Sequence, residues 1–388
     1  MIRGSFVAVS LVIASVGTQG AFADRIDWEM VVGPGAATPA GFGDTNNTFA
    51  VSAVVSGQFV YLGTFNEVTG AEVWRTTDGT SWTQVNSNGF GHPENQGVYS
   101  MTTFLGYVFA ATWGGFTVGP PTRVWRSPDG TTWTQANIDG FGDTDTAEPH
   151  SMAVHNGFLH VGVSNFPDGA EVWESVNGFN FSQANVDGFG DGDNQQVFAL
   201  ESFEGSLYAG TENVVDGAQM RRTDGGGLSW AQVNSDGFGD SDNTAIWSTA
   251  VLDDTLFAGT WNGSTGAEVW RSANGTTWTQ ANADGFGESA NWAAASMAVV
   301  GGALYVGTYN TGGAEVWATG DGASWSQVNS DGFGSSSNFQ VRVLVEHNGA
   351  LYAGVSNGSG LRVYRARIAV FADGFESGGT SRWSSVVP

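Results

Sequence analysis

The sequence contains no cysteine and no lysine. Without cysteine there can be no disulfide bond, thiol catalysis or cysteine-based zinc site, so packing alone must stabilise the fold. All 13 basic residues are arginines, against 38 aspartates and glutamates, and the formal net charge is −25. A field of this sign repels nucleic acid and anionic membrane surfaces, so we expect neither as a partner.

Long apolar runs are also scarce. The longest is 6–16, which follows Arg3 and precedes the small residues of 21–23. This order is typical of a secretory signal peptide, and the run is too short to span a bilayer comfortably. We predict a signal peptide at 1–23 and a mature chain, without a transmembrane segment, that is secreted or held at the cell surface.

What the sequence does contain is a repeat. The tripeptide Gly-Phe-Gly recurs at intervals of about 48 residues, beginning at Gly41, Gly89, Gly140, Gly188, Gly237, Gly285 and Gly332. A fixed period of this size indicates one supersecondary unit copied along the chain around one continuous core. The aromatic content and the 58 glycines favour short strands and tight turns over helices.

Each repeat predicts four short strands, the pattern of a propeller blade. Between Gly285 and Gly332 the predicted strands are 296–300, 303–308, 314–317 and 324–328. The last repeat stops after its third strand at Tyr364, while a spare fourth strand, 27–31, precedes the first repeat. The sequence therefore predicts an all-β, seven-bladed β-propeller of four-stranded antiparallel blades over 24–370, closed by the N-terminal strand.

The turn before the fourth strand has a recurrent sequence. It reads Ser-Pro-Asp-Gly-Thr-Thr-Trp at 127–133, with related copies at 76–82, 223–230 and 272–278. The segment resembles the Asp-box of bacterial sialidase-like propellers, although most copies have one residue fewer between Asp and Trp. The resemblance implies a secreted bacterial propeller in which the Asp closes the turn and the Trp packs between sheets. It implies no catalytic role for the turn.

The segments that vary between repeats fall in two loop sets, which a propeller places on one face. Four residues after the position where Asn usually follows Gly-Phe-Gly, the chain reads Val51, Tyr99, His150, Phe198, Trp247, Ala295 and Arg342, and these are preceded by Glu148, Gln196, Trp292 and Gln340. The loop between the second and third strands begins at Phe65, Trp113, Ser164, Glu212, Trp261, Tyr309 and Ser356.

Aromatic rings stack on the apolar faces of sugars, and amides bond their hydroxyls. We therefore predict ligand contacts from Phe65, Tyr99, Trp113, Trp247, Trp261, Trp292, Tyr309 and Arg342. For any one of these residues, burial between blades is the alternative interpretation.

Three copies of the repeat motif carry several carboxylates, which suggests an oxygen cage for Ca²⁺. They are Asp139, Asp143 and Asp145, Asp187, Asp191 and Asp193, and Asp236, Asp240 and Asp242. Other copies, such as 334–338, lack them, and the spacing matches no EF-hand loop. No cofactor is required by the sequence, and Ca²⁺ is the one it suggests, with solvated turn residues as the alternative.

Enzyme signatures are mostly missing. The arginines recur at one third-strand position, which favours a structural role, and the histidines lack any metal-ligand spacing. His150, Glu148 and Glu212 are the only acid–base candidates. The leading hypothesis is a non-enzymatic, monomeric binding module for an extracellular glycan. The alternatives are a glycoside hydrolase or lyase that uses the same face, and a structural surface protein that mediates protein contacts. The tail at 371–388 is either a sorting or surface-retention segment or a disordered terminus.

Overall fold

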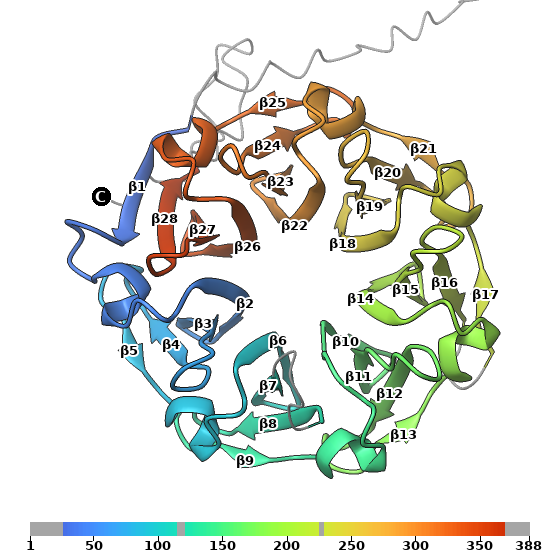
Figure 1. Ribbon diagram of the computed structural model, residues 1–388, viewed down its shortest axis with the longest axis horizontal. Helices are drawn as coiled ribbons and strands as arrows, with labels where there is room; N and C mark the ends of the chain where they lie inside the picture. Colours follow the sequence, from blue (N-terminus) through green and yellow to red (C-terminus); the bar gives the residue numbers. More distant parts are fainter. Residues whose placement is uncertain (1–25, 115–120, 225–228, 369–388) are drawn as a thin grey trace, which may run out of the picture.

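The computed structural model describes residues 26–114, 121–224 and 229–368, which form an all-β structure arranged around a central axis (Figure 1). The predicted signal peptide and C-terminal tail lie outside the described residues. The strands fall into repeated antiparallel units, which we call blades and name after the strand nearest the axis.

In each blade the strands follow one another from the axis to the outer wall (Figure 1). The innermost strands are β2 (Phe49–Ser56), β6 (Gly97–Phe104), β10 (Ser151–His155), β14 (Gln196–Phe203), β18 (Ala245–Leu252), β22 (Ala293–Val300) and β26 (Gln340–His347). The second strands are β3 (Phe59–Phe65), β7 (Tyr107–Trp113), β11 (Phe158–Val163), β15 (Ser206–Glu212), β19 (Thr255–Trp261), β23 (Ala303–Tyr309) and β27 (Ala350–Ser356).

The outer half of each blade is shorter. The third strands are β4 (Val73–Thr76), β8 (Arg123–Ser127), β12 (Glu171–Ser175), β16 (Met220–Thr223), β20 (Val269–Ser272), β24 (Val316–Thr319) and β28 (Arg362–Arg367). The outermost strands are β5 (Thr83–Gln84), β9 (Thr134–Gln135), β13 (Ser182–Gln183), β17 (Ala231–Gln232), β21 (Thr279–Gln280), β25 (Ser326–Gln327) and, beside β28, β1 (Trp28–Val32).

The N-terminal strand β1 pairs with β28, the last strand within the described residues. Trp28 lies opposite Ala366 and Glu29 opposite Arg365 in an antiparallel register. The Trp28 indole donates a hydrogen bond to the Val328 carbonyl of the neighbouring β22 blade, at 3.0 Å. Trp133 bonds Val85 of the preceding β2 blade in the same way, at 2.9 Å. The N-terminal strand thus takes the place and the contacts of an ordinary fourth strand.

The second strands are the most deeply buried, because both of their faces lie against neighbouring blades. In β3 every residue after Phe59 is buried, and β27 is buried throughout. This explains why their sequences are mostly apolar without strict alternation, as in strands covered on both faces.

The Gly-Phe-Gly segments form short 3₁₀-like turns between blades. They are η1 (Ala40–Gly43), η2 (Asn88–Gly91), η3 (Asp139–Gly142), η4 (Asp187–Gly190), η5 (Asp236–Gly239), η6 (Asp284–Gly287) and η7 (Asp331–Gly334). In η5, Gly237 (φ 54°) and Phe238 (φ 59°) are both left-handed, which costs a non-glycine residue about 1–2 kcal/mol. The Phe238 ring stacks on Trp270 at 4.8 Å, and the Asn243 amide bonds the Gly237 carbonyl at 2.9 Å. Packing and hydrogen bonding therefore hold this conformation in place.

An aspartate side chain closes the turn before the outermost strand. In the turn at 127–133, the Asp129 carboxylate accepts hydrogen bonds from the backbone amides of Thr131 and Thr132, at 2.8 and 2.7 Å. These bonds favour the ionised carboxylate and lower the pKa of Asp129. Arg75 of the preceding blade then donates to the Asp129 carbonyl at 3.1 Å, so the turn also joins two blades.

Strand boundaries differ from the predicted ones at both sides of a blade. The innermost strand β22 begins at Ala293 instead of residue 296, because a bulge at Ala295 interrupts the alternation on which the prediction relied. The outermost strand β25 is limited to Ser326–Gln327, because Trp325 turns inward to bond Ala281 of the preceding blade.

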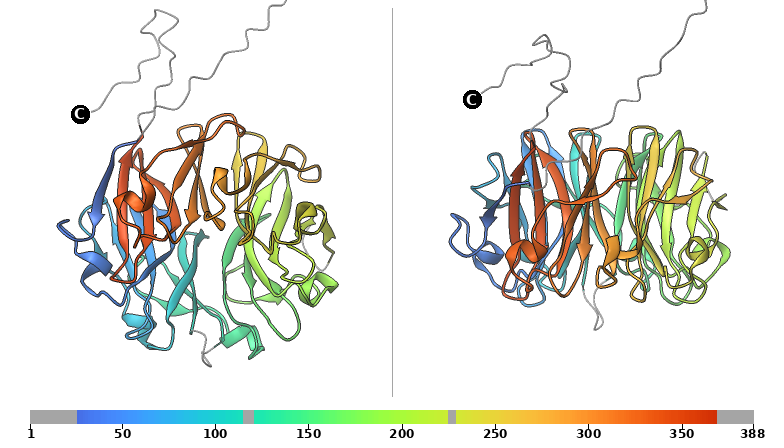
Figure 2. Two further views of the ribbon diagram at one scale, coloured as in Figure 1. Left: turned by 45° about the horizontal axis from the view of Figure 1, so that its top comes forward. Right: turned by 90° about the horizontal axis from the view of Figure 1, so that it is seen from above.

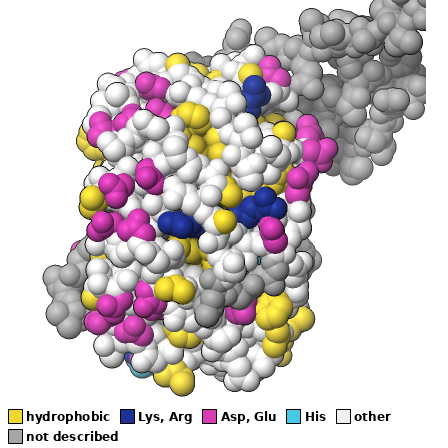
Figure 3. Space-filling model, turned by 90° about the vertical axis from the view of Figure 1, so that its right-hand side faces the viewer, with side chains coloured by type: hydrophobic (Ala, Val, Ile, Leu, Met, Phe, Trp, Pro, Cys, Tyr) yellow, Lys and Arg dark blue, Asp and Glu magenta, His cyan; other side chains and the backbone are white. Residues whose placement is uncertain are grey.

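The outer wall of the molecule is rich in acidic side chains. In the view of Figure 3, aspartates and glutamates are scattered over the surface, and few arginines lie among them. This distribution agrees with the formal net charge of −25.

Candidate functional site

The variable loops lie on one face of the propeller, which we call the loop face. It carries the connections from second to third strands and from fourth strands to the next blade. The opposite face, which we call the Asp-box face, carries the Asp-box-like turns and the hairpins between first and second strands. Described residues begin and end on the Asp-box face, where Ile26 bonds Val328 and Ile368 bonds Gly349 (Figure 2).

A β-bulge directs the variable residue of the innermost strand toward the axis. In β18, pairing with β19 shifts register between Ile246 and Ser248, so Trp247 has no opposite partner. The same shift leaves Tyr99 and Arg342 unpaired in β6 and β26. Bulges re-aim side chains in this way beside many functional sites. Each blade contributes its variable residue to the lining of the central channel: Val51, Tyr99, His150, Phe198, Trp247, Ala295 and Arg342.

A cavity of 860 Å³ opens at the axis on the loop face. Its volume lies in the usual range for small-molecule sites. The predicted site residues in its lining are Tyr99, Trp113, Trp247, Trp261, Arg342, Glu148, His150 and Glu212, together with Asp145 of the predicted calcium carboxylates. Phe65, Trp292 and Tyr309 are not part of that lining.

Stacked aromatic rings form one wall of the cavity. Trp247 stacks on Phe198 at 4.5 Å and on Trp261 at 5.0 Å, and both tryptophans are half-buried. Trp261 also contacts Tyr309 at 5.3 Å, which in turn stacks on Trp292. The wall therefore continues around the axis beyond the cavity.

The aromatic residues on the opposite side are buried. Phe65, Tyr99 and Trp113 pack in one cluster with Val51, each less than a tenth exposed. The sequence predicted ligand contacts from all three aromatics. In the structure Phe65 is core, while Tyr99 and Trp113 reach the cavity only at their edges.

A polar network joins the two carboxylates of the cavity. His150 Nε2 lies 2.6 Å from a Glu148 oxygen and 2.7 Å from the Gln196 side-chain oxygen. The Gln196 amide nitrogen in turn donates to Glu212. Since both groups facing Nε2 are acceptors, Nε2 carries a proton, and in the neutral ring Nδ1 is left as an acceptor that faces Arg342 at 3.5 Å.

The two carboxylates differ in their readiness to ionise. Burial, together with the charge of Glu148, raises the pKa of Glu212 to about 7. Burial acts on Glu148 too, but the hydrogen bond and charge of His150 and the charge of Arg342 outweigh it, so the pKa of Glu148 is lowered. The cavity thus pairs a carboxylate with a carboxyl group that stays protonated close to neutral pH.

The lining residues that sequence reasoning missed include Phe166, Pro167 and Val214. Phe166 and Val214 each follow the recurrent Asn of the loop after the second strand, and they are 47% and 60% exposed. That position varies as strongly as the one before the Asn, reading Glu67, Phe166, Val214, Gly263, Thr311 and Gly358. Variation was therefore a usable signal on both sides of the Asn.

The predicted calcium carboxylates have protein partners. Asp139 pairs with Arg123 at 3.0 Å, and Asp143 accepts from Asn165 at 3.2 Å. Asp236 accepts from Gln219 and Gln232. Within the described part of the chain, no group of three or more histidines or acidic residues is placed to hold a metal ion. Calcium binding stays a prediction, which a lower melting temperature after chelation would support.

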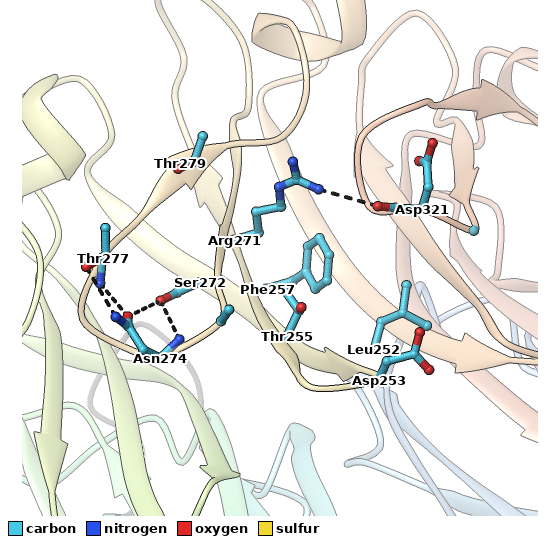
Figure 4. A pocket seen from close by; sticks show the side chains of 12 residues that line it. Leu252, Asp253, Thr255, Phe257, Arg271, Ser272, Asn274, Thr277, Thr279 and Asp321 are labelled. Atoms are coloured by element: carbon cyan, nitrogen blue, oxygen red, sulfur yellow. Dashed lines mark hydrogen bonds between the residues drawn. The ribbon is translucent and has the colours of Figure 1, made fainter. Parts of the chain in front are cut away.

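A second pocket, of 620 Å³, lies between the β18 and β22 blades on the Asp-box face (Figure 4). Arg271 extends past Phe257 and donates to the Asp321 carbonyl at 3.4 Å and to the Gly322 carbonyl at 3.0 Å. Asn274 closes its own turn by accepting from Thr276 and Thr277. The polar groups here serve contacts that other blades repeat, so this pocket is a weaker candidate than the cavity.

Comparison with known proteins identifies the fold. No family model and no curated protein matches the sequence. Among solved structures, the chain resembles the extracellular domain of a one-component system from B. thetaiotaomicron (15% identity, TM-score 0.57, covering 81% of this chain and 38% of that one).

It also resembles an ancestral GH74 enzyme (14%, TM-score 0.60, 85% and 49%) and the polysaccharide lyase Uly1 (11%, TM-score 0.51, 90% and 98%). The chain spans less than half the length of the first two. At these identities the likeness concerns the fold alone, which is a β-propeller.

Proposed function

We propose that this protein is a carbohydrate-binding propeller whose cavity on the loop face receives a sugar without turning it over. The observation that carries the proposal is the stacked wall of Phe198, Trp247 and Trp261 beside the polar groups of Gln196 and Glu212. Stacked rings suit the apolar face of a pyranose, and amide and carboxyl groups suit its hydroxyls. A GH74 enzyme and a polysaccharide lyase among the similar structures fit this class of ligand.

We also propose that the ring is seven-bladed and closed, and that the protein acts outside the cell as a monomer. Closure is supported by the pairing of β1 with β28 and by the hydrogen bond from the Asn357 amide to the Thr48 carbonyl, which joins the last and first blades. Export is supported by the predicted signal peptide and by the extracellular domain among the similar structures. No helix in the described part of the chain has the length and apolar character to span a membrane.

Two matched phenylalanines test the binding proposal. Phe166 lines the cavity and is 47% exposed, while Phe179 lies in an Asp-box-like turn and is 46% exposed. Phe166→Ala should weaken glycan binding by about 3- to 10-fold, the value of one aromatic contact. Phe179→Ala should leave affinity unchanged. The measurement is a glycan array followed by calorimetry on the best ligand, and the absence of any bound sugar at millimolar concentration would refute the proposal.

A second candidate is a glycoside hydrolase or lyase that uses the same cavity. It is favoured by the divergent pKa values of Glu148 and Glu212, which resemble the acid and base of a carboxylate pair. If the protein degrades a polysaccharide, Glu212→Gln should abolish turnover while leaving binding intact. Turnover that survives substitution of Glu212, Glu148 and His150 would exclude these residues as catalysts.

A third candidate, a surface protein that contacts other proteins, is favoured only if no glycan binds. The exposed side chains of Phe166 and Val214 on the loop face would then be the natural contact area.

A further inference from the structure

An arginine side chain crosses the centre of the channel. Arg342 belongs to the β26 blade, yet its guanidinium carbon lies 5.2 Å from the ring centre of Tyr99 in the β6 blade and 5.7 Å from that of Trp247 in the β18 blade. Its Nη2 is 3.5 Å from Nδ1 of His150 in the β10 blade. The channel positions of the blades on either side of Arg342, Val51 and Ala295, are small. The cation therefore sits near the axis, in the lining of the cavity.

This arginine has no counter-ion within the described residues. The carboxylate whose charge acts on it, Glu148, is hydrogen-bonded to His150 instead. Arg123, whose side chain is 10% exposed, provides the contrast, because it contacts the carboxylates of both Glu94 and Asp139. Burial lowers the pKa of Arg342, which is the electrostatic mark of a charge removed from water without full compensation.

Keeping a guanidinium partly out of water without a counter-ion is costly, and an incoming anion would reduce that cost. The planar fork of arginine matches a carboxylate or a sulfate in a bidentate geometry. The stacked rings of Trp247 and Trp261 lie beside the same cavity, so one ligand can offer a sugar face to the rings and an acid group to the arginine.

We propose that the cavity selects acidic sugars, with the carboxylate or sulfate ester of the ligand paired to Arg342. This inference rests on the proposed carbohydrate-binding function and specifies its ligand class. The acidic surface repels long polyanions, so the site suits a short glycan, or a chain end, that carries a single acid group.

The test uses three short ligands and calorimetry on the intact protein. They are a disaccharide ending in glucuronic acid, the same disaccharide with its carboxyl group reduced to an alcohol, and a disaccharide of neutral sugars bearing one sulfate ester. We expect the better acid to bind about 10- to 100-fold more tightly than the reduced form, the value of a charge-assisted hydrogen bond. Whether the carboxylate or the sulfate binds more tightly identifies the acid group.

Variants then locate the effect. Arg342→Gln should erase the preference for the acid, so that the acidic and the reduced disaccharide bind with equal affinity, and Arg342→Lys should retain part of the preference. Arg222→Gln is the matched control, since it removes an equal charge from an exposed ion pair with Asp224. Melting temperatures show that each variant is folded.

The outcomes separate this inference from the function on which it rests. Equal affinity of the wild-type protein for the acidic and reduced ligands would refute acid selection but keep carbohydrate binding. An acid preference that persists in Arg342→Gln would refute the role of Arg342. Binding of no sugar at all would refute the proposed function itself.

Discussion

The channel positions and the outer-wall positions recur in every blade, but the residues at the outer wall are nearly constant and those at the channel vary. Around the outer wall, the Gly-Phe-Gly phenylalanine stacks on a third-strand ring in nearly every copy, as in Phe42 on Trp74 and Phe286 on Trp317. Around the channel, the bulged residue is an arginine in one blade, a tryptophan in another and an alanine in a third. Constancy marks the contacts that build the fold, and variation marks those free to serve a ligand.

Removing a ring from the outer wall should have the largest effect on stability. Phe238 is buried and stacked on Trp270, so Phe238→Ala should lower the free energy of unfolding by about 3–5 kcal/mol. Trp247→Ala, at a channel position, should cost only about 1 kcal/mol, because Trp247 is half-buried and loses mainly its stacking contacts. Urea denaturation measures the free energy of unfolding of both variants. Similar decreases in the two would contradict the proposed difference between outer wall and channel.

A buried histidine in the second strand β11 should make the stability of the fold depend on pH. Burial, and the neighbouring His155, lower the pKa of His160 from 6.5 to about 4. Below pH 6.5 the unfolded chain binds a proton that the folded chain refuses, so stability should fall by about 3 kcal/mol as the pH drops to 4. His160→Phe adopts the residue that other blades use here, Phe109 and Phe257, and should remove this loss. The measurement is the free energy of unfolding of wild type and variant at several pH values from 7 to 4. An equal decrease in both proteins would contradict the prediction.

A carboxyl group in the cavity, that of Glu212, should stabilise the fold at low pH, whereas His160 destabilises it there. The pKa of Glu212 is raised from 4.5 to about 7, so the folded chain keeps a proton that the unfolded chain releases. The stabilisation is complete below pH 4.5 and is lost as the pH rises through 7, by about 2 kcal/mol after discounting for solvent access to the cavity. Glu212→Gln should flatten this slope in denaturation measured from pH 4.5 to 8. If the free energy of unfolding of the variant changed with pH as steeply as that of the wild type, a group other than Glu212 would be the one that titrates.

The periodic features of the fold were predictable from the sequence, since a repeat makes each strand visible several times. The pairing of β1 with β28 followed from a spare strand at one end and a missing strand at the other. The Asp-box-like turns followed from residues whose backbone-bonding geometry is local.

The site was only partly predictable. Variation identified Trp247, Trp261 and Arg342 as lining residues, but it also selected Phe65, which the structure buries against Tyr99. Burial depends on how neighbouring blades meet, and no single repeat encodes that. The reach of Arg342 across the axis depends on a bulge and on small neighbours in other blades, which are long-range facts.

The seam between the last and first blades has a consequence for the order of folding. Most fourth-strand tryptophans bond the preceding blade, but within the described residues the Trp82 indole nitrogen, which faces this seam, has no hydrogen-bond partner. The strand pair that joins the chain ends, β1 with β28, links residues about as distant in sequence as the fold permits, so its closure carries the largest loop entropy. We expect the pairing of β1 with β28 to form last during folding and to open first in partial unfolding. Among the strands, the backbone amides of β1 should therefore exchange their hydrogens fastest.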